Sequence, residues 1–337
     1  MARLVSSKRC LTCASVLAYC LVCTTLTFAQ SDLNEVHVNP LPSPKLQNNP
    51  ENQVPAYTNA SIIRKNVDLV MVPVTVTDQR DRIVTGLDQS NFQLFDGKQR
   101  QAIKHFSSED APVSLGIILD LSSSMAKKMD WARQAVMEFC KAANPLDEFF
   151  MVTFADRPEL ALDFTKQPDD IQRRLAFADA HGRTALLDAV YLSLSQMHHA
   201  QYQKRALLII SDGGDNRSRY TESEIRSMVK EADVEIYAIG IFDRGSEVPE
   251  EVNGPILLED IAGLTGGRAF AIDNVNLLPA LAVRVGAELR NQYVLAYSPD
   301  DSLRNGKWHK IKIKLSVPHS LWPLMIHAKP GYYAPAQ

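Results

Sequence analysis

Apolar and polar residues alternate along residues 112–292 with two periods, one typical of strands and one typical of helices. Nearly continuous apolar runs predict buried strands over residues 113–120, 147–156, 205–212 and 234–242. Amphipathic runs predict helices over residues 129–143, 169–179, 184–200, 221–232 and 276–292, while residues 256–273 predict a helix, a glycine turn and a short strand. This order predicts an α/β fold with a mainly parallel, doubly wound sheet that helices cover on both faces.

Strand-like patterns also flank this region on both sides. Residues 67–78 are rich in valine, and residues 82–108 contain a DGK turn between two short strand candidates. Further strand patterns lie over residues 293–299, 308–317 and 324–335. Because neither flank alone has enough strands for an independent core, we expect residues 61–110 and 291–335 to fold together. The product would be a small β-sandwich-like module with the α/β domain, residues 111–290, inserted in it.

Residues 310–315 have the sequence KIKIKL. Ile311, Ile313 and Leu315 alternate with lysines, which is the two-residue period of a half-buried strand. This pattern favours a solvated lysine face over a dedicated anion site.

The N-terminus has the three parts of a secretory signal peptide: a basic start, an apolar run, and small residues before Gln30. We therefore predict a cleaved signal over residues 1–29, with export to the periplasm, the cell surface or the medium. The alternative is an uncleaved membrane anchor, since the apolar run is nearly long enough to span a bilayer. Residues 30–60 are rich in Pro and Asn without an apolar period, which indicates a disordered linker.

Composition narrows the function further. The 337 residues are 45% hydrophobic, as expected for a globular protein, and the formal charge of −3 argues against nucleic-acid binding. Cleavage after residue 29 would remove three basic residues and no acid, leaving a charge of −6. It would also leave Cys140 as the only cysteine, so we expect no internal disulfide and no cysteine metal site. Cys140 has helical spacing from Val136 and is predicted to be a buried small hydrophobe.

Oxygen-bearing side chains gather where three segments leave predicted strands or open a helix. They are Asp120, Ser122 and Ser124 in DLSSS, Thr184 in GRTALLDA, and Asp212 in SDGGDN. In open α/β sheets, ligands bind outside the carboxyl ends of the strands. The alternatives are structural, because Asp and Ser also cap helices and a Gly-rich polar segment also forms a simple turn.

These residues resemble the von Willebrand factor type A (VWA) domain family, whose metal-ion-dependent adhesion site (MIDAS) reads Asp-x-Ser-x-Ser, then Thr, then Asp. Asp120, Ser122, Ser124, Thr184 and Asp212 match it in order. The resemblance spans about residues 112–290. The flanking stretches VPVTVTD, FQLFDGK and KPGYYAP are similar to VWA-related proteins of acidobacteria.

An oxygen-only ligand set favours Mg²⁺, Mn²⁺ or Ca²⁺ over zinc, and a set with only two carboxylates suits Mg²⁺ best. The family resemblance implies that one Asp binds through water, so the ion stays electrophilic and accepts an Asp or Glu from a protein partner. It also implies a non-enzymatic adhesion or assembly module. It further implies that the last helix of the domain moves when ligand binds. Here that helix, residues 276–292, would pass the movement to the β module.

Two other functions stay open at this point. In the first, the metal activates water for hydrolysis, although no Glu or His has an obvious spacing for a general base. In the second, the ion only holds loops together and meets no partner. For Asp188 and Asp215 two interpretations stay open. They either orient the metal ligands through hydrogen bonds or are solvated surface acids. His198 and His199 are adjacent on a predicted helix and lack metal-ligand spacing.

Overall fold

The computed structural model describes residues 69–212, 214–242, 249–299, 305–317 and 323–334, all within one compact unit that spans Arg64–Gln337. The predicted signal peptide and linker lie outside the described residues. Within the described part of the chain, no helix is both long enough and apolar enough to cross a membrane.

The central sheet of the α/β domain has six strands in the order β10-β9-β8-β5-β6-β7. Its strands are β5 (Val113–Asp120), β6 (Glu148–Phe154), β7 (Pro158–Thr165), β8 (Lys204–Ser211), β9 (Glu235–Ile241) and β10 (Ala269–Ile272). All neighbours pair in parallel except β6 and β7, which are antiparallel. The chain leaves β5 first toward β6 and then crosses back to β8, so the topological switch point lies between β5 and β8.

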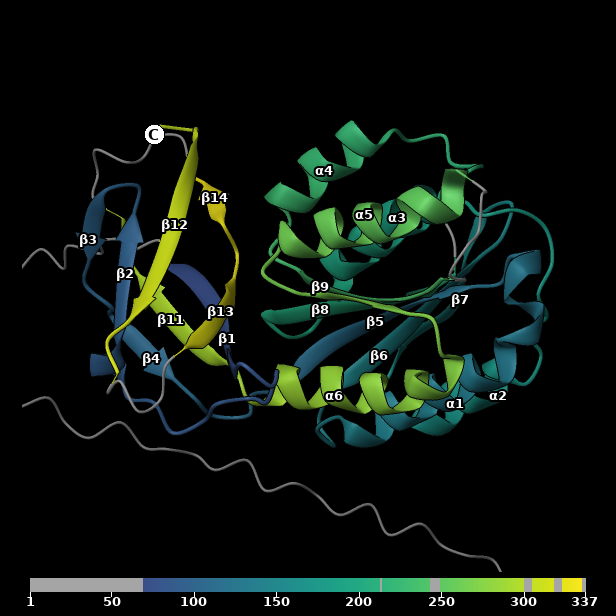
Figure 1. The fold of residues 1–337 in the computed structure, drawn as a ribbon, viewed down its shortest axis with the longest axis horizontal. Helices are drawn as coiled ribbons and strands as arrows, with labels where there is room; N and C mark the ends of the chain where they lie inside the picture. Colours follow the sequence, from purple (N-terminus) through teal and green to yellow (C-terminus); the bar gives the residue numbers. More distant parts are fainter. Residues whose placement is uncertain (1–68, 213, 243–248, 300–304, 318–322, 335–337) are drawn as a thin grey trace, which may run out of the picture. The chain divides into compact units, whose positions relative to one another are not determined.

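Helices cover both faces of this sheet, as the sequence predicts (Figure 1). One face carries α1 (Met129–Ala142), α2 (Pro168–Leu175) and α6 (Leu278–Arg290), and the other carries α3 (Leu186–Gln196), α4 (Glu222–Glu231) and α5 (Pro249–Gly263). Short 3₁₀ helices also occur: η1 (Gln89–Asn91), η2 (Ser123–Lys127), η3 (Met197–His199) and η4 (Val275–Leu277).

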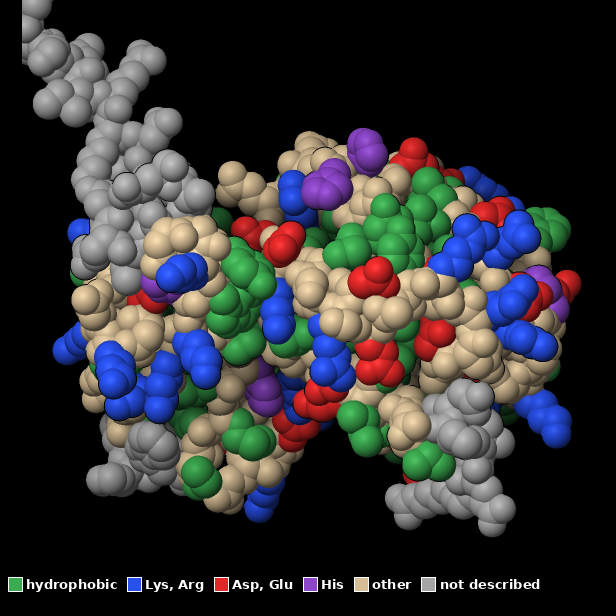
Figure 2. Space-filling view, turned by 90° about the horizontal axis from the view of Figure 1, so that it is seen from above, with side chains coloured by type: hydrophobic (Ala, Val, Ile, Leu, Met, Phe, Trp, Pro, Cys, Tyr) green, Lys and Arg blue, Asp and Glu red, His purple; other side chains and the backbone are tan. Residues whose placement is uncertain are grey.

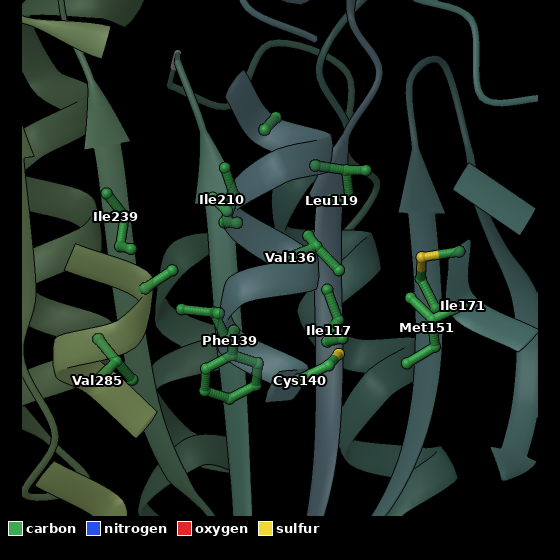
Figure 3. Close-up of a cluster of buried hydrophobic side chains, with 14 of the residues drawn as sticks. Ile117, Leu119, Val136, Phe139, Cys140, Met151, Ile171, Ile210, Ile239 and Val285 are labelled. Atoms are coloured by element: carbon green, nitrogen blue, oxygen red, sulfur yellow. The ribbon is translucent and has the colours of Figure 1, made fainter. Parts of the chain in front are cut away.

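Burial explains the apolar runs of the sequence. Every residue of β5, β6 and β9 is buried, because helices lie on both sides of these strands. On α1, the buried side chains recur every three or four residues. They share one core with sheet residues such as Ile117 of β5 and Met151 of β6 (Figure 3). Cys140 is part of this core, 4% exposed, and its burial raises the pKa of its thiol to about 12.

The β module consists of two antiparallel four-stranded sheets with the orders β13-β1-β11-β4 and β14-β12-β2-β3. Its strands are β1 (Val70–Asp78), β2 (Phe92–Asp96), β3 (Gln99–Gln101), β4 (His105–Ser107), β11 (Tyr293–Tyr297), β12 (Trp308–Leu315), β13 (Leu324–Ala328) and β14 (Gly331–Tyr333). Strands that precede the α/β domain pair with strands that follow it, as β1 does with β11 and β2 does with β12. Val74, Leu94, Tyr297 and Ile311 share one core between the two sheets.

The structure differs from the sequence prediction at three places. Strand β7 was not anticipated, since its half-buried edge position gives a weak apolar signal. Helix α2 ends at Leu175 and not at residue 179. Helix α3 begins at Leu186, so Thr184 lies in the loop before the helix.

Candidate functional site

The candidate site lies at the carboxyl ends of β5 and β8, on either side of the topological switch point. Asp120 is the last residue of β5, and Asp212 directly follows β8. Because β5 and β8 pair in parallel, with Leu119 opposite Ile210, both carboxylates reach the same edge of the sheet. Both are buried, with exposed fractions of 0% for Asp120 and 2% for Asp212.

Asp120 is held from two sides. The backbone N–H of Ser122 donates to Oδ1 at 2.7 Å, and the Ser211 hydroxyl donates to Oδ2 at 2.5 Å. Burial raises the pKa of Asp120 to about 6, and the charge of Asp212 adds to the rise, while the hydrogen bonds from Ser122 and Ser211 oppose it. Ser211 was not among the residues predicted from the sequence, because it is the end of an apolar strand pattern.

A chain of hydroxyls connects the first loop to Asp212. The Oγ atoms of Ser122 and Ser124 are 3.0 Å apart, and Ser124 donates to Oδ1 of Asp212 at 2.8 Å. Ser122 is buried while Ser124 is exposed, so the cluster opens to solvent on the Ser124 side. The structure thus brings together four of the five predicted residues through side-chain contacts.

Thr184, the fifth residue, contacts Asn216, in the loop that follows β8, through its backbone N–H and carbonyl. Its N–H donates to Oδ1 of Asn216 at 3.0 Å, and its carbonyl accepts from the N–H of Asn216 at 3.0 Å. The same loop meets the first one where Ser123 N–H donates to Gly182 O at 3.1 Å. Thr184 is 5% exposed. The three loops are therefore fixed to one another.

Asp188 and Asp215 hold these loops in place. Asp215 accepts from the N–H of Leu187 at 2.9 Å at the start of α3, and also from the hydroxyl of Ser218. Asp188 accepts from the N–H groups of Arg219 at 2.8 Å and Tyr220 at 3.2 Å. Both carboxylates thus orient the segments that carry Thr184 and Asp212, which agrees with a positioning role more than with solvated surface acids.

Lys128 is a further residue of the site. Its Nζ lies 2.8 Å from Oδ2 of Asp212, and its side chain is 17% exposed. The two site carboxylates and this ammonium carry a combined charge of −1. In the sequence, the signal for Lys128 was only a lysine eight positions after Asp120, in a stretch that resembles a solvated helix.

Helix capping does not account for DLSSS. Helix α1 begins at Met129, its N-cap is Lys128, and no side chain caps it. Ser122 is the N-cap of η2, yet its side chain makes no capping hydrogen bond either. Asp120 instead accepts from the Ser122 N–H and the Ser211 hydroxyl, and the Ser122 and Ser124 hydroxyls lead to Asp212.

The donor set consists of oxygen atoms, the type of ligand that hard cations prefer. Among the described residues, no three His, Cys, Asp or Glu side chains gather into a metal site, so hydroxyls would have to complete the shell here. Two carboxylates with three hydroxyl groups nearby suit an oxygen-preferring ion that retains some water, as Mg²⁺ does.

Comparisons with known proteins found one sequence relative and several similar solved structures. A chain of 22% identity occurs in Borreliella burgdorferi, an uncharacterised protein; the match covers 190 residues, 49% of this chain and 55% of that protein's length. A von Willebrand factor type A structure from Catenulispora acidiphila is similar, with a TM-score of 0.47, 11% identity, and coverage of 81% of this chain and 75% of that one. Proximal thread matrix protein 1 from the mussel byssus, with a zinc-occupied MIDAS motif, has a TM-score of 0.46 and 16% identity over 58% of this chain and 49% of that one.

A family model also matches part of the chain: residues 115–214 match the von Willebrand factor type A domain. That range includes Asp120, Ser122, Ser124, Thr184 and Asp212. Residues 115–214 are therefore similar to a VWA domain.

Proposed function

We propose that Asp120, Ser122, Ser124, Thr184 and Asp212 hold one divalent cation, with Mg²⁺ the best fit and Mn²⁺ or Ca²⁺ as alternatives. The observation that supports this most is the oxygen cluster itself. Two buried carboxylates lie at one sheet edge, Asp120 accepts from the Ser122 N–H and the Ser211 hydroxyl, and Asp212 accepts from the hydroxyl of the exposed Ser124. When bound, such an ion supplies a Lewis-acidic position for an incoming oxygen ligand.

The charges indicate which ligand that would be. Asp120, Asp212 and Lys128 sum to −1, so a divalent ion gives the site a charge of +1. A positive, solvent-open site attracts a carboxylate. We therefore propose a non-enzymatic binding module that accepts an Asp or Glu of a protein partner, in adhesion or assembly outside the cytoplasm.

The test uses Mn²⁺ as the ion and glutarate as the probe carboxylate. Water-proton relaxation reports how many exchangeable waters the bound Mn²⁺ retains. The proposal predicts a saturable loss of such water as glutarate is added to the wild-type protein, and no such signal with Asp120→Asn. The Asp130→Asn variant, which changes a 90% exposed acid of α1, is the matched control.

The outcomes separate the three functions. Bound Mn²⁺ that keeps its waters at saturating glutarate would favour an ion that only stabilises loops. Metal-dependent and Asp120-dependent turnover of an ester or phosphate ester would favour the hydrolase. Displacement of water without turnover supports the binding module.

A further inference from the structure

The β module has a basic face. On β12, Ile311 and Leu315 are buried in the module's core, while Lys310, Lys312 and Lys314 are exposed on the opposite face. Alternate residues of a strand lie about 6.6 Å apart along its axis. The three lysines therefore form a regular row along the outside of the sheet.

The neighbouring strands extend this charge. Lys312 lies opposite Phe95 of β2, and Phe95 lies opposite Arg100 of β3, which is exposed. Figure 2 shows Lys and Arg side chains gathered over the β module on the left of the molecule. The basic face is defined here as Lys310, Lys312, Lys314 and Arg100.

No exposed acid lies within the described strands that carry the basic face. Asp96 is the one acidic residue in the described strands β14, β12, β2 and β3; it is 2% exposed and accepts from the inward hydroxyls of Tyr297 and Tyr332, both at 2.9 Å. In the same part of the chain, no ion pair involves the four cations of the face. Residues 111–290, in contrast, contain 27 acidic and 19 basic residues. An anionic polymer would therefore be drawn to the β module and repelled elsewhere.

A groove opens beside the basic face. It has a volume of about 700 Å³ and lies between η1 and the β2–β3 hairpin. Its lining includes Arg100, the amides of Gln89 and Gln93, the hydroxyl of Ser90, and the apolar Phe92 and Ile103. Gln93 is opposite Lys314 in the strand register, so groove and lysine row adjoin. Amide and hydroxyl groups over an apolar floor can bond sugar hydroxyls, while the cations match acidic substituents.

We propose that the basic face and this groove bind a linear acidic polysaccharide. A bilayer is flat and would not enter the groove. Single-stranded nucleic acid needs open aromatic rings for stacking. Here Lys314 lies over the ring of Phe95 at 5.0 Å, and Lys230 lies over Trp308 at 5.7 Å. Tyr333, which is 43% exposed, packs edge-on against Trp308 with the ring centroids 5.0 Å apart. A peptide that adds a strand needs a long unpaired edge. Strand β12 is paired on both sides, with β14 and β2, and β3, the edge strand beside the groove, has only three residues.

The test is fluorescence anisotropy with labelled polygalacturonate and labelled dextran sulfate, with neutral dextran as the uncharged control. EDTA is present throughout, so that no carboxylate can be held through a metal at the VWA site. This keeps the result independent of the proposed function. The polyanion that binds tighter identifies the acidic group as carboxylate or sulfate.

The variants are the triple K310Q/K312Q/K314Q and a control triple, K127Q/K141Q/K166Q, at exposed positions of the α/β domain. Because an exposed pair contributes up to about 1 kcal/mol, we expect the first triple to weaken binding on the order of tenfold and the control to stay near wild type. Added NaCl should weaken wild-type binding. Arg100→Gln should weaken it as well, since this residue lies on both the face and the groove.

Three results would overturn the proposal. The first is that neither polyanion binds at low salt, and the second is that both triple variants weaken binding equally. The third is that the lysines support tighter binding to anionic phospholipid vesicles or single-stranded DNA than to the polysaccharides. Unchanged circular dichroism and melting temperature of the triple variants would show that they fold.

Discussion

The ammonium of Lys128 lies 2.8 Å from Oδ2 of Asp212, one of the two carboxylates of the candidate metal site. The other carboxylate oxygen of Asp212, Oδ1, accepts a hydrogen bond from the Ser124 hydroxyl. A divalent ion bound by Asp212 would lie close to this ammonium, and the two positive charges would repel each other. Lys128 therefore opposes the metal and, once the metal is bound, adds positive charge for an acidic partner.

Lys128→Met should consequently strengthen the binding of Mg²⁺ and weaken the binding of a carboxylate ligand. Loss of one positive charge beside the ion should raise Mg²⁺ affinity by roughly tenfold, since close charge pairs interact by about 1 kcal/mol or more outside bulk water. The same loss should weaken glutarate binding to the metal-loaded protein. Calorimetry measures both, with Lys127→Met, an exposed neighbour, as the control. Equal metal affinity in all three proteins would show that Lys128 does not act on the site.

A second prediction concerns the ion pairs between α6 and the β1–β2 loop. The two carboxylate oxygens of Asp81 accept from Arg268 at 2.7 and 2.9 Å. The side chain of Glu288 is fully buried and accepts from Arg268 at 2.7 Å and from Arg284 at 3.1 Å. Burial raises the pKa of Glu288, while the two arginines oppose the rise. Asp81 has a φ of 63°, which Asn also tolerates. Asp81→Asn should therefore lower the free energy of unfolding by about 1 kcal/mol without backbone strain. Urea denaturation measures this, and an unchanged midpoint would contradict it.

The same contacts provide a physical route for the relay proposed between the metal site and the β module. Helix α6 ends at Arg290, and β11 starts at Tyr293. If ligand binding shifts α6, then Mn²⁺ with glutarate should change hydrogen exchange over residues 276–297. The Asp81→Asn variant should enlarge that change by releasing the helix. Identical exchange with and without ligand would exclude the relay.

His327 should make stability depend on pH. Burial lowers the pKa of His327 to about 4, and the positive charge of Arg268 adds to this effect, with Asp81 opposing it. The unfolded chain takes up this proton near pH 6.5 and the folded protein only near pH 4. Stability should thus fall as the pH drops from about 6.5 to 4, by about 1 kcal/mol after screening of a partly exposed group. His327→Gln should flatten this part of the profile in urea denaturation; identical slopes in both proteins would contradict the assignment.

The cysteines test the predicted export signal. Four of the five cysteines lie before residue 30, and Cys140 is buried with a raised thiol pKa. If the signal is cleaved, denatured protein from the exported fraction should titrate one thiol, and native protein at pH 8 should titrate almost none. Five thiols after denaturation would show that the segment is retained.

The sequence predicted most of the sheet because buried parallel strands are nearly continuous apolar runs; β5, β8 and β9 are examples. It missed β7, an edge strand with half-buried residues such as Pro158 and Leu162, whose pairing with β6 depends on tertiary contacts.

For the site, the order and spacing of five oxygen-bearing residues identified the cluster. Contacts between distant residues could not be read from spacing. Lys128 is 84 positions from Asp212, and Ser211 is 91 positions from Asp120. Only the parallel pairing of β5 with β8 brings these residues together.

Calorimetric titration with Mg²⁺ and Mn²⁺ measures whether the oxygen cluster binds one divalent cation. We predict one bound ion per wild-type chain and no measurable binding by Asp120→Asn or Asp212→Asn, whereas Asp130→Asn and Ser123→Ala bind as wild type does. Binding that survives both site substitutions, or the absence of binding in the wild-type protein, would contradict the account.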